Sequence, residues 1–348
     1  MAKTTKEDAL QWYAQNREIY KKLSEKVSNI LIELLDEAGL TVHAITNRTK
    51  DIDSFKNKID TKYEDPINQV TDLSGIRIIA YVEDDLKLIC GIIEDTFQID
   101  VNNSFNKSDE LGTDKVGYRS IHYIARIKDD RISLPEYKKF KELKFEIQVR
   151  TILQHAWAEI EHDKNYKFRG VLPPEIKRRF KIIAGTLELV DREFNLLSLE
   201  IDKIKQEVQI ATDSQTLDKI EINTTTVREF LLEKFTSEIN EKRISDSFDN
   251  HEINITEEVI DYGINNLQQL NSLFTEKTME VIKKTILIKR INLTSVVRLA
   301  LLINDYKKYF EKSWKNRWLK ISGDFIKVLE TDNNEIVEEI KKNAIEIV

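Results

Sequence analysis

The sequence contains few of the residues that interrupt or cross-link a polypeptide. Its 348 residues include nine glycines, four prolines and a single cysteine, Cys90. One cysteine cannot form a disulfide within the chain, and this favours a reducing compartment such as the cytoplasm. With so few breakers, the many Glu, Lys, Ile and Leu residues predict a largely helical protein with a hydrophobic core.

Long hydrophobic runs and an excess of positive charge are also lacking. No apolar stretch approaches the roughly 20 residues that a membrane-spanning helix needs, and the polar N-terminus does not resemble a signal peptide. We therefore expect a cytoplasmic protein with no membrane partner. The 54 Lys and Arg residues and 61 Asp and Glu residues give a net charge of −7. This excludes a surface that attracts nucleic acid everywhere, but it allows local basic patches.

Three common motifs for nucleotide or metal sites are missing too. The sequence has no phosphate loop of the type GxxxxGK[ST], no dinucleotide-binding GxGxxG and no pair of cysteines for zinc. Any nucleotide site in this chain must therefore be built from other residues.

Up to about residue 215, hydrophobic periodicity predicts strands mixed with helices. Helices are expected over 5–38, within 43–59, over 84–97, from about 151, and again to about 210. Strands are expected over 75–82, 97–103, 121–127 and 143–149, with a polar loop over 107–120. Thr4 and Glu7 have the spacing of a capping box for the first helix. The pattern predicts an α/β (α+β) domain, a mixed sheet flanked by helices.

Strand signals almost disappear after residue 215. We place a boundary near 213–222 and expect a first domain over 1–215 and an α-helical accessory domain over 216–348. The segment SVVRLALLI, 295–303, is apolar nearly all round, which predicts a buried helix. We expect this accessory domain to form a homo-oligomer, to bind a regulatory partner or to restrain the first domain.

The first of four polar clusters is NRTKDIDSFKNK. Arg48, Lys50, Lys56 and Lys58 concentrate positive charge that neutralises triphosphate oxygens, and Ser54 adds a hydroxyl donor. A solvated basic helix face is the alternative interpretation.

The second cluster, TDLSGIRIIAY, places Asp72 just before a buried strand and Arg77 within it. A carboxylate at a strand edge is a natural Mg²⁺ ligand, and a buried arginine needs a partner. A purely structural Asp72–Arg77 pair is the alternative.

The third cluster, KVGYRSIHY, offers Tyr118 as a flat face for a base, and Lys115, Arg119 and His122 as phosphate contacts. A hairpin loop entering a strand would have a similar sequence.

The fourth cluster, KFEIQVRT, alternates so that Glu146, Gln148 and Arg150 share one strand face. Glu146 can share Mg²⁺ with Asp72 or accept a proton from an attacking hydroxyl, and we expect Gln148 and Arg150 to face the acceptor nucleotide. The alternative is a polar face in water. Two carboxylates on separate strands among Arg and Lys residues fit Mg²⁺-dependent phosphoryl transfer.

The next segment, HAWAEIEHDKNYK, places His155, Glu159 and His162 on one helical face. Without a nearby cysteine or further histidine, this is a weak zinc pattern, and we interpret the helix as a support for chemistry on the preceding strand.

Taken in order, these stretches resemble the synthetase domain of the RelA/SpoT family from about residue 40 to about 170. The resemblance implies a nucleotidyltransferase-like fold and a pyrophosphokinase. Such enzymes move the β,γ-pyrophosphate of ATP to the 3′-hydroxyl of GDP or GTP, releasing AMP and the alarmone (p)ppGpp of the stringent response.

The resemblance also implies roles for single residues. On the donor side, Arg48, Lys50 and Lys56 match the ATP-phosphate contacts, Arg77 an adenine-stacking arginine and Asp72 the Mg²⁺ ligand.

On the acceptor side, Glu146 matches the catalytic glutamate, as a base or second metal ligand, and Tyr118 the tyrosine that stacks on guanine. Lys115, Arg119 and His122 match acceptor-phosphate contacts. His155 stands where we expect an amide or acidic residue that reads guanine.

Two features depart from the larger family members. Only about 40 residues precede the first cluster, so we expect no alarmone hydrolase domain, and the C-terminal part does not resemble a β-rich regulatory module. Two alternative functions remain open. One is a toxic synthetase that pyrophosphorylates the 3′ end of tRNA, docked by basic runs such as 177–181, or that makes adenosine analogues. The other is an inactive member that only binds nucleotides or a partner.

Overall fold

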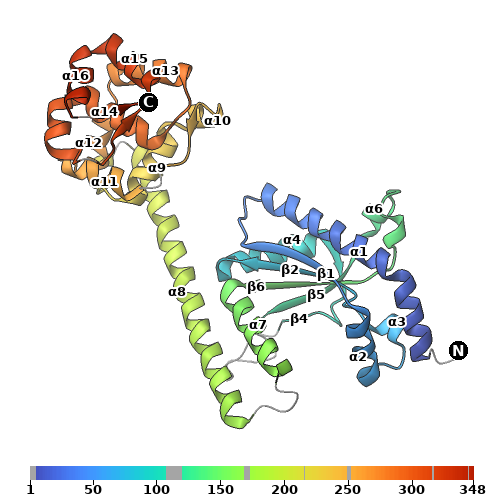
Figure 1. Cartoon of the computed structure of the whole chain (residues 1–348). Helices are drawn as coiled ribbons and strands as arrows, with labels where there is room; N and C mark the ends of the chain where they lie inside the picture. Colours follow the sequence, from blue (N-terminus) through green and yellow to red (C-terminus); the bar gives the residue numbers. More distant parts are fainter. Residues whose placement is uncertain are drawn as a thin grey trace. The chain divides into compact units, whose positions relative to one another are not determined.

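A computed structural model describes residues 5–106, 120–167, 173–214, 216–248, 252–315, 317–343 and 345–348. The chain divides into two compact units, Met1–Ser198 and Leu199–Val348 (Figure 1). Each has a hydrophobic core of its own.

The N-terminal unit is built on a mixed six-stranded sheet. Its strands are β1 (Ala44–Thr49), β2 (Ser74–Ala80), β3 (Phe97–Ile99), β4 (Phe105–Asn106), β5 (Ile121–Ile127) and β6 (Phe145–Thr151). The order is β1-β2-β6-β5-β3, and β4 pairs with β5. Strands β2 and β6 are parallel, whereas the other pairs of this sheet are antiparallel. The mixed sheet expected from the sequence is confirmed.

One face of this sheet is apolar. Alternation directs Ile76, Ile78, Phe145, Ile147 and Val149 into a core shared with two helices. These helices are α1 (Lys6–Glu37) and α4 (Glu83–Thr96), which cover this face (Figure 1). Burial of these aliphatic and aromatic side chains is what fixes the register of the central strands.

The start of α1 lies one residue later than the sequence pattern predicts. Thr5 caps the helix and forms a reciprocal capping box with Asp8. Thr4 with Glu7 and Thr5 with Asp8 both have the spacing of a capping box, so the spacing alone could not show which threonine caps the helix. The strand expected over 97–103 is also shorter. After β3 the chain turns at Asp100, whose carbonyl accepts from Asn103 and Ser104, and then forms β4.

Further helices complete the N-terminal unit. They are α2 (Ile52–Lys62), α3 (Pro66–Gln69), α6 (Asp129–Ile132), the 3₁₀ turn η1 (Lys138–Phe140), α7 (Ile152–Lys167) and the first part of α8 (Pro174–Asp213). Thr151 at the end of β6 donates to Asp191 of α8 at 2.6 Å, and Asn195 donates to Asp84 of α4 at 2.9 Å. These bonds anchor α8 to the sheet.

The C-terminal unit is a helical bundle with short two-residue strands. Its helices include α9 (Thr224–Lys234), α10 (Thr236–Asn240), α11 (Glu252–Asp261), α12 (Leu267–Ser272), α13 (Glu276–Ile288), α14 (Leu293–Lys308), α15 (Gly323–Asp332) and α16 (Asn334–Lys342). The paired strands are β7 (Ile244–Ser245) with β8 (Ile291–Asn292), and β9 (Lys320–Ile321) with β10 (Glu346–Ile347). Two further turns are η2 (Leu217–Lys219) and η3 (Tyr309–Ser313).

The predicted buried helix is confirmed, because α14 buries Val296, Val297, Leu299, Ala300 and Leu301. The division between the units lies within α8, whereas the sequence predicted it near 213–222. Val208 and Ala211, in the last turns of α8, already belong to the C-terminal core. In the part of the chain that the structure describes, no helix has both the length and the apolar character needed to cross a membrane.

Candidate active site

The second face of the sheet is polar, and strand pairing brings its side chains together. Arg48 of β1 pairs with Gly75 of β2, which pairs with Glu146 of β6. In the neighbouring row Arg77 pairs with Gln148, and Gln148 with His122 of β5. Because the rows are two residues apart, their side chains point to the same face.

A cavity of about 520 Å³ lies over this polar face. Strands β1, β2 and β6 form its floor, and α7 forms its wall. Its lining comprises Thr46, Asn47, Arg48, Gly75, Ile76, Arg77, Glu146, Gln148, Arg150, Trp157, Ala158, Glu159, Glu161 and His162. Three arginines and buried polar groups in one hollow are the composition expected of an anion site.

Glu146 lies in a chain of buried hydrogen bonds on this face. Its Oε1 accepts from Nδ1 of His122 at 2.8 Å, and its Oε2 accepts from Nε2 of Gln148 at 2.9 Å. Since the carboxylate can only accept, His122 donates from Nδ1. Nε2 of His122 lies 2.6 Å from the hydroxyl of Ser120, and Phe105 stacks on the imidazole with ring centroids 4.5 Å apart.

These contacts determine the charge of Glu146. Burial alone would raise its pKa, but the hydrogen bonds from His122 and Gln148 outweigh burial and lower the pKa below its ordinary value. The side chain is therefore a fixed, ionised acceptor at neutral pH. Two of its lone-pair positions are used by His122 and Gln148, so others can accept from a ligand hydroxyl.

Asp72 lies just before β2 and is held by two ammonium groups. Its Oδ2 accepts from Lys58 at 2.7 Å and lies 2.8 Å from Nζ of Lys50. Burial would raise the pKa of Asp72, but the two lysines outweigh that effect and lower it. Its Oδ1 is buried and has no hydrogen-bond partner. A buried carboxylate oxygen with free lone pairs fits a Mg²⁺ ligand.

The two arginines expected to contact the donor nucleotide, Arg48 and Arg77, are held in different ways. The side chain of Arg48 lies over Gly75, where an added Cβ would lie 3.4 Å from Cγ and Nε of Arg48. Arg77 donates to Glu159 of α7 at 2.9 Å. The Asp72–Arg77 pair considered from the sequence is therefore wrong, because each residue has other partners.

His155 lies beside Arg77 and Glu159, and its Nδ1 is 3.8 Å from the Glu159 carboxylate. Burial lowers the pKa of His155, and the nearby Arg77 charge lowers it further. The structure thus groups His155 with the arginine assigned to the donor. Among the side chains described, no set of three or more His, Cys, Asp or Glu residues has the geometry to hold a metal.

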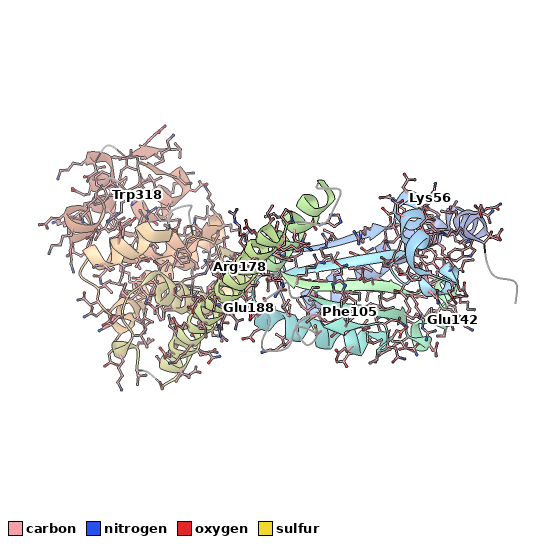
Figure 2. All side chains as sticks on the ribbon, turned by 90° about the horizontal axis from the view of Figure 1, so that it is seen from below. Lys56, Phe105, Glu142, Arg178, Glu188 and Trp318 are labelled. Carbon is pink, nitrogen blue, oxygen red and sulfur yellow. The ribbon has the colours of Figure 1, made fainter. Side chains whose placement is uncertain are left out.

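The expected site residues fall into four groups. Arg48, Arg77, Glu146, Gln148 and Arg150 line the cavity. Outside this lining, His122 is bonded to Glu146, His155 lies 3.8 Å from Glu159, and Lys50 pairs with Asp72. Ser54 and Lys56 are exposed on α2 and are not part of the lining (Figure 2). Lys115, Tyr118 and Arg119 lie outside the described residues.

Sequence reasoning did not single out three residues that the structure adds, and it did not predict the partner of a fourth, Glu159. Thr46 and Asn47 line the cavity from β1, Glu159 binds Arg77, and Ser120 extends the His122 chain. Ser120 had a usable signal, since it lies two residues before His122 and alternation points both to one side. The sequence placed Glu159 on one helical face with His155 and His162, but it gave no signal for its partner Arg77, which lies 82 residues away.

Residues 47–170 match the family model described as the region found in RelA / SpoT proteins. This region of the chain is therefore similar to RelA/SpoT proteins. GTP pyrophosphokinase YjbM of Bacillus subtilis is 27% identical over 203 residues, covering 56% of this chain and 89% of that protein. GTP pyrophosphokinase YwaC of the same organism is 26% identical over 162 residues, covering 45% of this chain and 73% of that protein.

One solved structure, a GTP pyrophosphokinase family protein from Streptococcus pneumoniae, is 25% identical. It is matched over 56% of this chain and 95% of its own, with a TM-score of 0.46. The matched region contains the end of β1, strands β2 to β6 and α7, and so includes every residue that lines the cavity except Thr46. Both curated relatives carry the enzyme class expected from the sequence, that of a pyrophosphokinase.

Proposed function

We propose that the N-terminal unit transfers the β,γ-pyrophosphate of ATP to the 3′-hydroxyl of GDP or GTP, producing (p)ppGpp and AMP. The observation that carries this proposal is the convergence of Arg48, Arg77 and Arg150 with the ionised Glu146 in one cavity of a RelA/SpoT domain. Phosphoryl transfer depends mainly on positioning and on neutralising the charge of the phosphates, and this cavity offers both.

On the donor side, Arg48 is directed across Gly75 toward the cavity and can bind phosphate oxygens bidentately. Arg77 presents a planar guanidinium that can stack on the adenine ring. Lys50 and Lys58 keep Asp72 ionised and oriented. Asp72 would hold Mg²⁺ through Oδ1, and the ion would supply charge neutralisation to the triphosphate.

On the acceptor side, Glu146 would receive the proton of the attacking hydroxyl. Its orientation is set by His122 and Gln148, and Arg150 in turn donates to Oε1 of Gln148 at 2.5 Å. A nucleophile held by such a fixed carboxylate needs little reorganisation before it attacks. Acceptor phosphates would bind near Arg150 and the chain entering β5.

The proposal is tested by incubating the full-length protein with γ-labelled ATP and Mg²⁺, and with GDP, GTP, an adenosine nucleotide or tRNA in separate reactions. We expect label in the guanosine nucleotide, with AMP as co-product. Label in tRNA or in the adenosine nucleotide alone would contradict alarmone synthesis, and no transfer to any acceptor would indicate a member that only binds nucleotides or a partner.

The tRNA acceptor deserves its own reaction because of one surface feature. Lys177, Arg178, Arg179 and Lys181 are all exposed at the start of α8, and Arg178 is labelled in Figure 2. Four exposed cations on one helical segment can bind phosphates of a nucleic acid. If tRNA is the acceptor, reversing these four charges will reduce the rate of transfer to tRNA. The rates of transfer to the free nucleotides will stay unchanged.

A further inference from the structure

The C-terminal unit contains a second cavity, of about 280 Å³, outside the RelA/SpoT region. It lies between the end of α13, the strands β8 and β9, and the first turns of α14 and α15. Its lining comprises Thr285, Ile288, Lys289, Arg290, Ile291, Asn292, Ser295, Arg298, Leu302, Trp318, Lys320, Ile321, Ser322, Asp324 and Phe325. The volume lies just below the range of roughly 300–1,000 Å³ that is typical of small-molecule sites.

The lining is rich in positive charge, although the chain has a net charge of −7. Lys289, Arg290, Arg298 and Lys320 contribute four cations and Asp324 contributes one carboxylate, while Arg298 is paired with the buried Glu258 behind the wall. Lys320 is paired with Glu346 at the surface, and Lys289 lies 3.3 Å from the hydroxyl of Ser322. A locally cationic hollow in an acidic protein is a place where anions collect.

The rear wall of the cavity is fixed by a buried polar network. Glu258 is fully buried, and both of its oxygens accept from Arg298, with the shortest contact at 2.6 Å. Tyr309 donates to Glu258 at 2.6 Å, and the indole of Trp318 donates to the Tyr309 hydroxyl at 2.7 Å. The Arg298 guanidinium lies 5.7 Å from the Trp318 ring centroid.

This network holds two wall side chains, Arg298 and Trp318, in one orientation. A buried ion pair of this kind contributes little net stability compared with apolar packing, but it pre-organises the groups it holds. Phe325 lines the cavity together with Trp318, so the lining combines flat aromatic surface with cations. Figure 2 marks Trp318 in the C-terminal unit.

We propose that this cavity binds a small phosphorylated ligand that carries a planar ring, of about mononucleotide size. Lys289 and Arg290 would bind the phosphate, and Trp318 and Phe325 would pack against the ring. Asp324 would accept a hydrogen bond from a sugar hydroxyl. The site would be separate from the candidate active site, since none of its residues lies in the RelA/SpoT region.

The chain contains four tryptophans, which makes the test specific. Trp318 lines this cavity and Trp157 lines the candidate active site. Full-length protein labelled with 5-fluorotryptophan would be titrated with AMP, GMP, ribose 5-phosphate and inorganic phosphate, and the ¹⁹F resonances assigned by Trp→Phe variants. A shift at Trp157 reports the active site, and a shift at Trp318 reports the second cavity, so failure at one is distinguishable from failure at the other.

We expect AMP or GMP to shift the Trp318 resonance saturably, with a Kd at least about fivefold below that of ribose 5-phosphate, because the base stacks. The double variant Lys289→Glu/Arg290→Glu should raise that Kd at least tenfold. Lys283→Glu/Lys284→Glu, two exposed residues of α13 outside the lining, makes the same charge change and should leave it unaltered.

Three results would overturn the proposal. The first is a Trp318 resonance that none of the four probes moves. The second is an equal Kd for the Lys289→Glu/Arg290→Glu variant and the wild type. The third is an equal Kd for mononucleotides and inorganic phosphate, which would show that the aromatic wall does not bind a ring.

Discussion

Two carboxylates with different surroundings organise the candidate active site. Glu146 is oriented by hydrogen bonds from the His122 imidazole and the Gln148 amide. Asp72 is oriented by the ammonium groups of Lys50 and Lys58. Both are kept ionised, but only Asp72 retains a buried oxygen without a hydrogen-bond partner. We therefore propose that Asp72 binds the metal and that Glu146 accepts the proton in the proposed reaction.

Glu146→Gln is the direct test of the proton acceptor. Glutamine keeps the size and one acceptor oxygen but cannot take up a proton, so kcat should fall about 10²- to 10⁴-fold. Thermal unfolding should change little. Glu142→Gln, a matched change at an exposed residue near the start of β6 (Figure 2), should retain wild-type activity. Comparable activity in Glu146→Gln and the wild type would refute this assignment.

Asp72→Asn tests the ion pairs with Lys50 and Lys58. At pH 7 the variant should lose about 1–3 kcal/mol of unfolding free energy, because two partly buried lysines lose their anion. The native pKa of Asp72 is lowered from 3.8, so this stability is present above pH 3.8 and is lost as the pH falls below it. Urea unfolding should therefore show a constant difference above about pH 5 that shrinks below about pH 4.

The exposed Asp53 of α2 provides the control. Asp53→Asn should change the unfolding free energy by less than about 0.5 kcal/mol at pH 7. An Asp72→Asn difference that persists unchanged at pH 3 would show that the ion pairs are not its source.

At the scale of single elements, α8 is held to the sheet by the Asp191 carboxyl group, which is buried where a negative charge is unfavourable. Asp191 is buried, and burial raises its pKa to about 6 although Thr151 donates to it. A raised pKa means that the native state prefers the neutral carboxyl. Stability from this group is therefore complete below pH 3.8 and is lost as the pH rises to about 6.

Asp191→Asn should consequently stabilise the protein above pH 6. The amide keeps an acceptor for Thr151 and has no charge to bury, so we expect a gain of about 1–3 kcal/mol at pH 7 and almost none below pH 4. Unfolding curves across this range would measure it. Glu193→Gln, an exposed change on the same helix, should show no such pH dependence, and a wild type more stable than Asp191→Asn at pH 7 would contradict the account.

The local hydrophobic pattern of the sequence was sufficient to predict most helices and strands, but not to predict which strands pair with each other. The Ile-rich run at 75–82 and the alternation in 143–149 predicted two strands, and the structure confirms both. The parallel pairing of β2 with β6 joins residues about 70 positions apart. No local periodicity encodes that choice, so the Arg77–Glu159 pair could not be predicted from sequence.

Two errors of position have a similar origin. The capping box was placed one residue early because both Thr4 and Thr5 have an acidic residue three positions on. The boundary was placed where the long helix ends, because the helical pattern of α8 continues unbroken through residue 198. Only tertiary packing of Val208 and Ala211 reveals that its last turns belong to the second core.

At the scale of the whole molecule, the two cores are separate. Phe235 is fully buried in the C-terminal core and packs edge-on against Phe274, with ring centroids 5.5 Å apart. Phe235→Ala should cost about 3–5 kcal/mol of local stability. Hydrogen exchange should accelerate in α13 and α14 and stay unchanged in β2 and β6.

Leu287→Ala serves as the surface control, since that side chain is 73% exposed, and it should leave exchange unchanged. If amides of β2 and β6 accelerate as much as those of α14 in Phe235→Ala, the chain unfolds as one cooperative unit and the division into two cores has no energetic meaning.

The central claim, pyrophosphate transfer from ATP, is tested most directly by following the β-phosphate. Wild-type protein would be incubated with β-labelled ATP, Mg²⁺ and GDP, and labelled products would be quantified together with AMP. We predict that the β label moves to the guanosine nucleotide and that one AMP forms for each labelled product. Release of ADP with the β label still on the donor nucleotide would contradict the account.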